Sequence, residues 1–294
     1  MTLRHSDFPK ALLSIPDPPP YLYVKGTICK KDVNAIAVVG TRVPTQYGIA
    51  AAESISRELA GSGITIVSGM ARGIDAAAHR GALAANGRTI AVLGSGIDVI
   101  YPSDNKKLYE QIISSGAVVS EFPIGTAPLA ENFPQRNRII SGLVKGVLVV
   151  EASEKSGSLI TAGLALDYGR DVFALPGNIT SFKSKGANKL IKQGAKLVED
   201  ARDILEELSI SGTGMVKTGF KPAPALPDSL RKIQADLSSE EEKIISLLDE
   251  PSFIDTIIQR TGLPAQKISA LLLDMELKGL VQQQAGKQFI RRGG

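Results

Sequence analysis

The sequence contains few of the residue types that most metal and redox sites require. It has one cysteine, Cys29, and two histidines, His5 and His79, among 294 residues. One cysteine rules out an intrachain disulfide, and so few thiols and imidazoles make a Cys- or His-based metal site unexpected. Tryptophan is absent and only 5% of residues are aromatic, which weighs against extensive stacking on nucleobases. We therefore expect neither a metal nor a cofactor.

Long apolar runs are also missing. No stretch approaches the roughly 18 uninterrupted apolar residues of a membrane-spanning helix. The first twenty residues contain charges and prolines instead of the apolar centre of a signal peptide. We therefore expect a cytoplasmic protein with no membrane partner. At 294 residues and 43% hydrophobic, the chain is long enough and apolar enough to bury a core in two domains.

Positive charge is unevenly distributed along the chain. The formal net charge is +4, but residues 236–294 carry seven basic and nine acidic side chains, a net of −2. The preceding residues therefore have a net charge of +6. The electrostatic argument for a nucleic-acid partner belongs to this larger N-terminal part.

Alternating strand and helix patterns predict an α/β fold. The proline-rich residues 1–34 are predicted to form an N-terminal arm packed on the main domain. Residues 35–208 alternate short apolar runs with helical segments, which favours an extended Rossmann-like, doubly wound and mostly parallel sheet. The predicted strands are 35–39, 64–67, 89–93, 117–120, 146–150 and 172–174, and the predicted helices are 48–59, 74–85, 106–114, 138–144, 159–167 and 187–193.

A linker and a small second domain are predicted after the sheet. Residues 209–235 are rich in Pro, Gly, Ser and Thr, which is typical of a linker. Residues 236–294 contain three helical stretches followed by a predicted hairpin, the organisation of a winged-helix domain. Its third helix balances Lys267 and Lys278 against Asp274 and Glu276. We therefore expect weak DNA contact or protein interaction there instead of sequence-specific base recognition.

Glycines and small hydroxyl residues follow several predicted strands, at 40–42, 68–73, 155–158 and 176–178. Open parallel sheets bind ligands beyond the carboxyl ends of their strands. Glycine lets backbone N–H groups come close to a phosphate, and a following helix N-terminus adds its dipole. With Arg42 and Lys155 nearby, these loops predict a site for more than one phosphate.

Two further segments add positive charge and amides. Residues 135–138 place Arg136 and Arg138 beside Gln135 and Asn137, a mixture suited to phosphate oxygens and base edges. Residues 183–196 contain five lysines and no acid. Taken alone, that run fits a solvated helix face, but next to the loops it favours a groove for a polyanion.

Two residue pairs could serve acid–base catalysis, and each has a structural interpretation. Asp75 and His79 lie four residues apart on one predicted helix. His79 is more simply a brace of the loop layer than a catalytic base. Glu121 and Glu151 lie at the ends of predicted strands. Each can anchor a neighbouring arginine and loop N–H groups instead of forming a catalytic carboxylate pair.

The serines after residue 155 also allow two interpretations. Ser156 and Ser158 could be nucleophiles, but no histidine is placed by sequence to activate them. We interpret both as hydrogen-bond donors of a phosphate-binding loop. Arg42 has a structural alternative as well, in which it ties neighbouring loops together.

These same segments resemble the DprA/Smf family of bacterial DNA-processing proteins. The resemblance runs in order from about Phe8 to about Glu199 and includes Gly40-Thr41-Arg42 and Lys155-Ser156-Gly157-Ser158. Each motif alone is common, but together they are specific. The matching segments are 17–20, 22–23, 26, 39–42, 68–75 with His79, 94–98, 101–102, 121–125, 133–142, 151–152, 155–162, 175–177 and 186–191.

The resemblance implies a function and two key residues. Members of this family bind single-stranded DNA on a Rossmann-like domain, dimerise, protect DNA taken up in natural transformation and load the recombinase RecA. The arginine and lysine that hold phosphates in the family correspond to Arg42 and Lys155. Many members carry a helical module before the Phe-Pro segment. Only seven residues precede Phe8, so the module is expected to be either absent or removed.

A binding protein is therefore expected, and not an enzyme. The alternative is a nucleotide-binding or nucleotide-hydrolysing enzyme of the related LOG-type phosphoribohydrolase scaffold, but Thr161 stands where the catalytic Glu of those enzymes is expected. Leu190, Ile191, Leu197 and Val198 cannot all face the core, and the remainder could form a homodimer interface. The predicted DNA-binding residues are Gly40, Thr41, Arg42, Ser68, Gly69, Ala71, Gly73, Arg136, Asn137, Arg138, Lys155, Ser156, Gly157, Ser158, Lys185 and Asn188.

Overall fold

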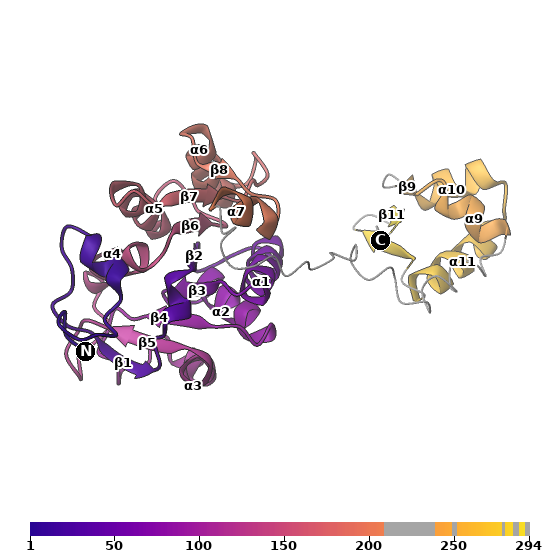
Figure 1. Cartoon of the computed structure of the whole chain (residues 1–294). Helices are drawn as coiled ribbons and strands as arrows, with labels where there is room; N and C mark the ends of the chain where they lie inside the picture. Colours follow the sequence, from indigo (N-terminus) through magenta and orange to yellow (C-terminus); the bar gives the residue numbers. More distant parts are fainter. Residues whose placement is uncertain (209–238, 249–251, 278–279, 285–287, 292–294) are drawn as a thin grey trace. The chain divides into compact units, whose positions relative to one another are not determined.

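The computed structural model describes residues 1–208, 239–248, 252–277, 280–284 and 288–291 (Figure 1). The chain divides into two compact units, Met1–Thr213 and Gly214–Gly294, here termed the sheet unit and the winged-helix unit. The linker predicted at 209–235 lies outside the described residues. No helix in the described part of the chain is both long and apolar enough to span a membrane.

The sheet unit is built on a mostly parallel sheet, as predicted. In the described residues the sheet has eight strands in the order β1-β5-β4-β3-β2-β6-β7-β8. β1 runs antiparallel to β5, and every other neighbouring pair is parallel. The strands are β1 (Tyr23–Gly26), β2 (Ala35–Val39), β3 (Thr65–Ser68), β4 (Thr89–Val92), β5 (Ala117–Ser120), β6 (Gly146–Val149), β7 (Asp171–Ala174) and β8 (Lys196–Leu197).

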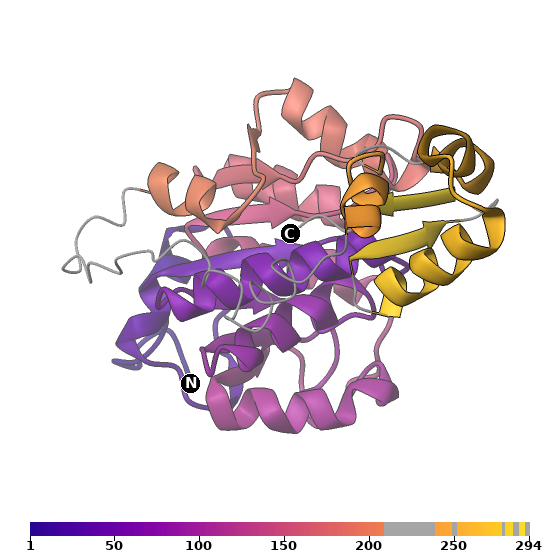
Figure 2. The ribbon, with the colours of Figure 1, turned by 90° about the vertical axis from the view of Figure 1, so that its right-hand side faces the viewer.

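Helices cover both faces of this sheet. Ala35, Ala37 and Val39 of β2 pack into one apolar cluster, and Ile36 and Val38 pack into another. Such alternation between two buried faces explains why the strands are continuous apolar runs. The first face is covered by α4 (Asn132–Leu143), α5 (Gly157–Asp167) and α6 (Lys185–Lys192), and the second by α1 (Gln46–Gly61), α2 (Ile74–Ala84), α3 (Lys106–Ser115) and α7 (Ala201–Glu207) (Figures 1 and 2).

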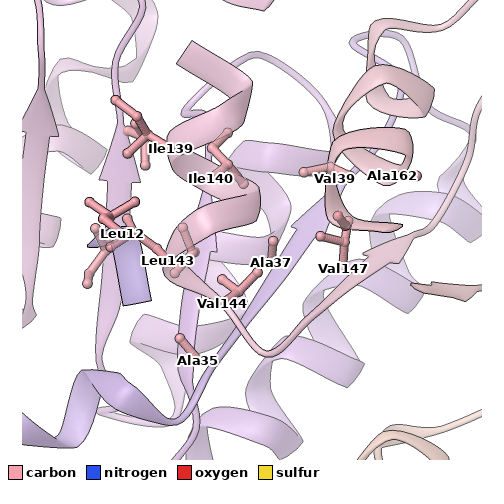
Figure 3. Packing of buried hydrophobic residues seen from close by; sticks show 14 of the residues in the cluster. Leu12, Ala35, Ala37, Val39, Ile139, Ile140, Leu143, Val144, Val147 and Ala162 are labelled. Carbon is pink, nitrogen blue, oxygen red and sulfur yellow. The ribbon is translucent and has the colours of Figure 1, made fainter. Parts of the chain in front are cut away.

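The N-terminal residues pack against α4. Leu12 lies in the short 3-10 helix η1 (Lys10–Ser14) and is fully buried next to Ile139 and Leu143 (Figure 3). The backbone can approach this closely because residue 142 is glycine. A Cβ atom there would lie 2.9 Å from side-chain atoms of both Leu12 and Ile15. A second 3-10 helix, η2 (Lys30–Val33), then leads into β2.

Most predicted elements are present, with ends shifted by no more than two residues. The exception is the helix predicted at 138–144, because α4 begins at Asn132. Pro134 lies in its first turn, where the missing N–H costs nothing, so proline did not mark a break in the helix. β1, β8 and α7 were not predicted.

The winged-helix unit also has the predicted architecture. Its helices are α9 (Ser239–Ile245), α10 (Ile254–Thr261) and α11 (Ala265–Leu277). β10 (Val281–Gln284) pairs with β11 (Gln288–Arg291), and β11 also pairs with β9 (Ser252–Phe253). The core of this unit is formed by Ile244, Leu248, Ile257, Ile268, Leu272, Met275, Val281 and Phe289.

Candidate nucleic-acid interface

The strand order creates a cleft at the carboxyl edge of the sheet. β2 lies between β3 and β6, so the sheet order reverses there. The chain leaves β2 for α1 on one face, whereas it leaves β6 for α5 on the other face. Loops that diverge in this way leave a ligand-binding crevice between them. A cleft of about 620 Å³ opens at this point, and among its lining residues are the predicted Gly40, Thr41, Arg42, Ala71, Arg136, Asn137, Ser156, Gly157 and Ser158.

The N-terminus of α5 faces this cleft. Ser156 is the N-cap residue, and its Oγ accepts a hydrogen bond from the Ser158 N–H and lies 2.8 Å from the Ser158 Oγ. Gly157 is the first residue of the helix and is exposed, as is Lys155 just before it. The first N–H groups of a helix have no partner within it and carry the positive end of its dipole. This loop therefore has the geometry and charge of an anion site.

Arg42 lies across the cleft on the loop after β2. Its side chain is exposed, and the guanidinium carbon is 5.1 Å from the centre of the Phe133 ring. The loop backbone is fixed independently of this side chain. The Thr41 N–H donates to the carbonyl of Glu151 at 2.8 Å, and the Thr41 carbonyl accepts from Ile74 N at 3.2 Å. Arg42 is thus a solvent-accessible cation on a loop that other groups hold in place. The alternative, in which the Arg42 side chain ties neighbouring loops together, is not what the structure shows.

The loop after β3 has a structural role that the sequence did not indicate. Asp75 is buried and accepts hydrogen bonds from Gly69 N at 3.1 Å and Ala71 N at 3.3 Å. Burial raises the pKa of the Asp75 carboxyl, which Arg136 and these N–H groups partly oppose. Ser68 is fully buried and donates to the carbonyl of Val38. We predicted that Ser68, Gly69 and Ala71 bind phosphate. That prediction was wrong for the Ser68 hydroxyl and for the N–H groups of Gly69 and Ala71, because all three already donate hydrogen bonds within the fold.

Gly73 ends this loop with a positive φ of 80°. A Cβ atom at this position would clash with the backbone of Thr41 and Arg42. Gly73 therefore brings the loop after β3 against the loop after β2, and it contributes to the site through this packing.

The two arginines of α4 are not together in the cleft, in contrast to our expectation. They are two residues apart, about 200° around a helix, so they project from opposite sides. Arg136 is buried and donates to the carbonyls of Gly69 and Val92, and burial lowers its pKa to about 10. Arg138 is buried elsewhere, where it pairs with Glu121 and donates to the Asp17 carbonyl at 2.6 Å. Arg138 ties the N-terminal arm to β5 and is not part of the cleft lining.

The acidic residues at the strand ends are anchors, as interpreted from the sequence. Glu121 pairs with Arg138, and burial raises its pKa. The Glu151 carboxylate accepts from the Thr45 N–H at 2.8 Å and the Thr45 hydroxyl at 2.6 Å. The interpretation of His79 was wrong, because its ring contacts Thr89 at the start of β4 and lies away from the loop layer.

The lysine run does not form one continuous cationic surface. Lys185 begins α6 and is exposed, but Lys196 is paired with Glu207 at 2.7 Å. The Asn188 amide is not a free group at the rim. It accepts from Gly177 N at 3.1 Å and donates to the Gly177 carbonyl at 2.9 Å, so it holds the loop after β7 in place.

Two aromatic side chains in the cleft were missed from the sequence. Tyr101 and Phe133 lie 5.8 Å apart between ring centres and line the cleft together with Pro128. Tyr101 is 45% exposed. The low aromatic content argued against base stacking, but composition does not reveal where the few aromatic residues gather. The position of Phe133 just before the Arg136–Arg138 segment was the available indication.

The fold and the cleft define an extended Rossmann-like protein with a winged-helix domain and a site suited to a polyanion. The sequence profile described as DNA recombination-mediator protein A matches residues 1–209, so the chain belongs to that family. The profile described as DprA winged helix domain matches residues 222–287. The DprA/Smf resemblance found in the sequence is thus confirmed.

Named relatives cover most of the chain. It is 40% identical to Protein Smf of Synechocystis sp. over 317 residues, covering 99% of this chain and 80% of the relative. It is 47% identical to the DNA processing protein DprA of Bacillus subtilis over 208 residues, covering 70% of each. These names support a DNA-processing role in recombination.

Solved structures agree with this assignment. DNA processing protein A of Streptococcus pneumoniae has a TM-score of 0.68 at 44% identity, covering 70% of this chain and 73% of that one. DNA processing protein A of Helicobacter pylori has a TM-score of 0.63 at 34% identity, covering 71% and 94%. The Helicobacter structure is described in terms of its single-stranded DNA binding mode.

Proposed function

We propose that this DNA-processing protein binds single-stranded DNA in the cleft and is not an enzyme. The observation that carries the proposal is the pairing of two surfaces in one cleft. Arg42 and the α5 N-terminus provide positive charge in the lining, whereas Tyr101 and Phe133 provide aromatic faces. Lys155 is exposed just before α5 and adds a further positive charge beside the cleft. A single strand can present a phosphate to the first surface and an unstacked base to the second, and a duplex cannot. The binding mode named for the Helicobacter relative supports the same ligand.

The cleft offers little for hydrolysis. Among the described residues that line it, Asp75 is the one carboxylate, and it already accepts from two backbone N–H groups. Thr161 is 2% exposed and occupies the position expected for the glutamate of the phosphoribohydrolase alternative. These features favour a binding protein that needs no cofactor.

The experiment is a fluorescence anisotropy titration of oligothymidine against a duplex of the same length. We expect the single strand to bind more tightly at every salt concentration. Equal affinity for the duplex would reject the proposal. Incubation with nucleoside monophosphates provides the second arm, and release of the free base would favour the hydrolase instead.

We further propose, from the family, that a homodimer protects incoming DNA and transfers it to RecA. The test is the rate of RecA assembly on oligothymidine coated with single-strand-binding protein. The protein should accelerate assembly, and a variant with Arg42→Ala and Lys155→Ala should not. Unchanged assembly rates with wild-type protein would reject RecA loading while leaving DNA binding intact.

A further inference from the structure

A second depression lies next to the cleft. It has a volume of about 560 Å³ and is lined by Thr45, Tyr47, Glu151, Pro176, Gly177, Asn178, Ser181 and Ser184. We call it the Tyr47 depression. The loop between β2 and α1 contributes Thr41 and Arg42 to the cleft and Thr45 to this depression. A strand that leaves the cleft over this loop would therefore reach the depression.

Tyr47 presents a fixed and accessible aromatic ring there. The residue lies in the first turn of α1 and is 53% exposed. Its hydroxyl donates to the Pro176 carbonyl at 3.0 Å. At the base of the helix, the hydrogen bonds from Thr45 to Glu151 hold the backbone. A ring fixed in this way can stack on a base with little loss of side-chain entropy.

The residues at the start of α6 offer hydrogen-bond donors for a phosphate. Ser184 is the N-cap residue of α6 and is 5% exposed. Its hydroxyl does not cap the helix, and it is not among the fully buried polar atoms that lack a partner. Because Ser184 lines the depression, its hydroxyl can donate to a ligand there. Lys185 follows it and is exposed.

The lining also carries negative charge near Tyr47. Burial and the charges of Glu151 and Glu199 raise the pKa of the Tyr47 hydroxyl. Both Glu151 carboxylate oxygens accept hydrogen bonds from Thr45, and the residue is 3% exposed. A phosphate is therefore expected on the Ser184 side, where the positive end of the α6 dipole and the exposed Lys185 ammonium group lie.

We infer that the Tyr47 depression is a second nucleotide subsite for the same single strand. One base stacks on the Tyr47 ring, and the adjoining phosphate is bound by the Ser184 hydroxyl and Lys185. This inference rests on the proposed function, because the strand must first occupy the cleft. It adds a requirement for length: short oligonucleotides fill the cleft, and longer ones engage both sites.

The experiment measures the affinity of oligothymidines of increasing length for wild type and Tyr47→Ala. Short oligonucleotides should bind both proteins equally. Above the length that spans both sites, Tyr47→Ala should bind about tenfold more weakly, the loss expected for one stacked base. Tyr47→Phe keeps the ring and should recover most of that affinity. Tyr21→Ala removes an exposed tyrosine that lines neither site and should match wild type.

A direct contact test uses wild-type protein and needs no mutation of the subsite. Oligothymidine carrying one 5-iodouracil is irradiated, and the crosslinked peptide is identified by mass spectrometry. At one position of the label, the adduct should be on Tyr47. Adducts confined to Phe133 and Tyr101 at every position would overturn the inference, even if Tyr47→Ala failed to fold.

A third variant separates this inference from the proposed function. Arg42→Ala should weaken short and long oligonucleotides alike. If it does so while Tyr47→Ala binds every length as wild type does, the second subsite is rejected and the cleft stands. If Arg42→Ala binds normally at all lengths, the proposed site itself is rejected.

Discussion

Nδ1 of His79 lies 2.6 Å from Oγ1 of Thr89 inside the sheet unit. The Thr89 hydroxyl donates its hydrogen to the Ile66 carbonyl at 2.8 Å, so it can only accept from His79. Nδ1 therefore carries the proton, and Nε2 has no partner among the described residues. Burial lowers the pKa of His79 to about 3, and Arg136 and Arg80 contribute to the shift. His79 is a neutral link from α2 to Thr89 of β4, and the Thr89 hydroxyl in turn bonds to β3.

This neutral histidine predicts a loss of stability in mild acid. An unfolded histidine has a pKa near 6.5, so below that pH the unfolded state binds a proton that the folded state does not. The free energy of unfolding should therefore fall as pH drops from about 6.5 towards 3, by up to about 1.4 kcal/mol per pH unit. Urea unfolding between pH 4 and 7 measures this slope.

His79→Gln is the matched variant for this measurement. It removes the titrating group, so its free energy of unfolding should depend less on pH, whatever its absolute stability. The raised pKa values of Asp75 and Glu121 act in the opposite direction but are present in both proteins. Parallel pH profiles for the two proteins would contradict the prediction.

Arg42 and Lys155 should each contribute one phosphate contact. Both side chains are exposed, so replacing either with alanine should leave thermal melting unchanged. Oligothymidine affinity should fall by a similar factor for every sequence, because phosphate contacts carry no sequence information. The slope of log affinity against log salt should become shallower by about 0.7. Lys31→Ala, an exposed lysine that lies just before β2, is the control. Normal affinity and slope in both variants would place the site elsewhere.

Phe133 should contribute by stacking. Phe133→Ala should weaken oligothymidine binding by about 1–3 kcal/mol, and the salt slope should not change because no charge is removed. Phe133→Tyr keeps an aromatic face and should bind nearly as wild type does. Anisotropy titrations at two salt concentrations measure both quantities. An altered slope with unchanged affinity would show that Phe133 acts only by holding Arg42.

The winged-helix unit should contribute little to DNA affinity. Residues 236–294 have a net charge of −2, and Lys267 of α11 is paired with Glu240 at 2.5 Å. A protein ending at residue 208 should therefore retain oligothymidine affinity within about tenfold, or ~1.4 kcal/mol. A greater loss in the same titration would assign part of the site to this unit.

Leu197 is the best candidate for a contact between two copies of the chain. Of the four residues considered for a dimer interface, Val198 is fully buried, while Leu190 and Ile191 pack partly against the core. Leu197 is 43% exposed on the edge strand β8. Light scattering at micromolar concentration should give a dimer, and Leu197→Arg should shift it towards monomer. A monomeric wild type, with or without DNA, would rule out the dimer.

The sequence predicted the core of the fold because that information is local. The five residues of β2 are apolar since both faces are covered, and such a run is recognisable without knowing its neighbours. β1 could not be found in this way. It exists because it pairs with β5, almost a hundred residues later, and nothing in its own four residues indicates that partner.

The contrast between local and long-range information also explains which site residues were predicted correctly. Arg42 and Arg138 are both arginines beside small or polar residues, so the sequence treats them alike. Glu121 and the Asp17 carbonyl, which are distant in sequence, bury Arg138, and Arg42 has no such partners. Tertiary neighbours decide whether a charged side chain is buried. The sequence therefore could not show that Arg138 lies outside the cleft.

The docking of Leu12 and Ile15 against Gly142, together with the pairing of β1 with β5, affects the order of assembly during translation. The ribosome makes these residues before their partners, which are all present only when α4 is complete. At about 5–20 residues per second, the delay is on the order of ten seconds. Throughout that time the nascent chain carries an apolar segment with no binding surface of its own. Residues 12–26 are therefore synthesised well before they can take their folded positions.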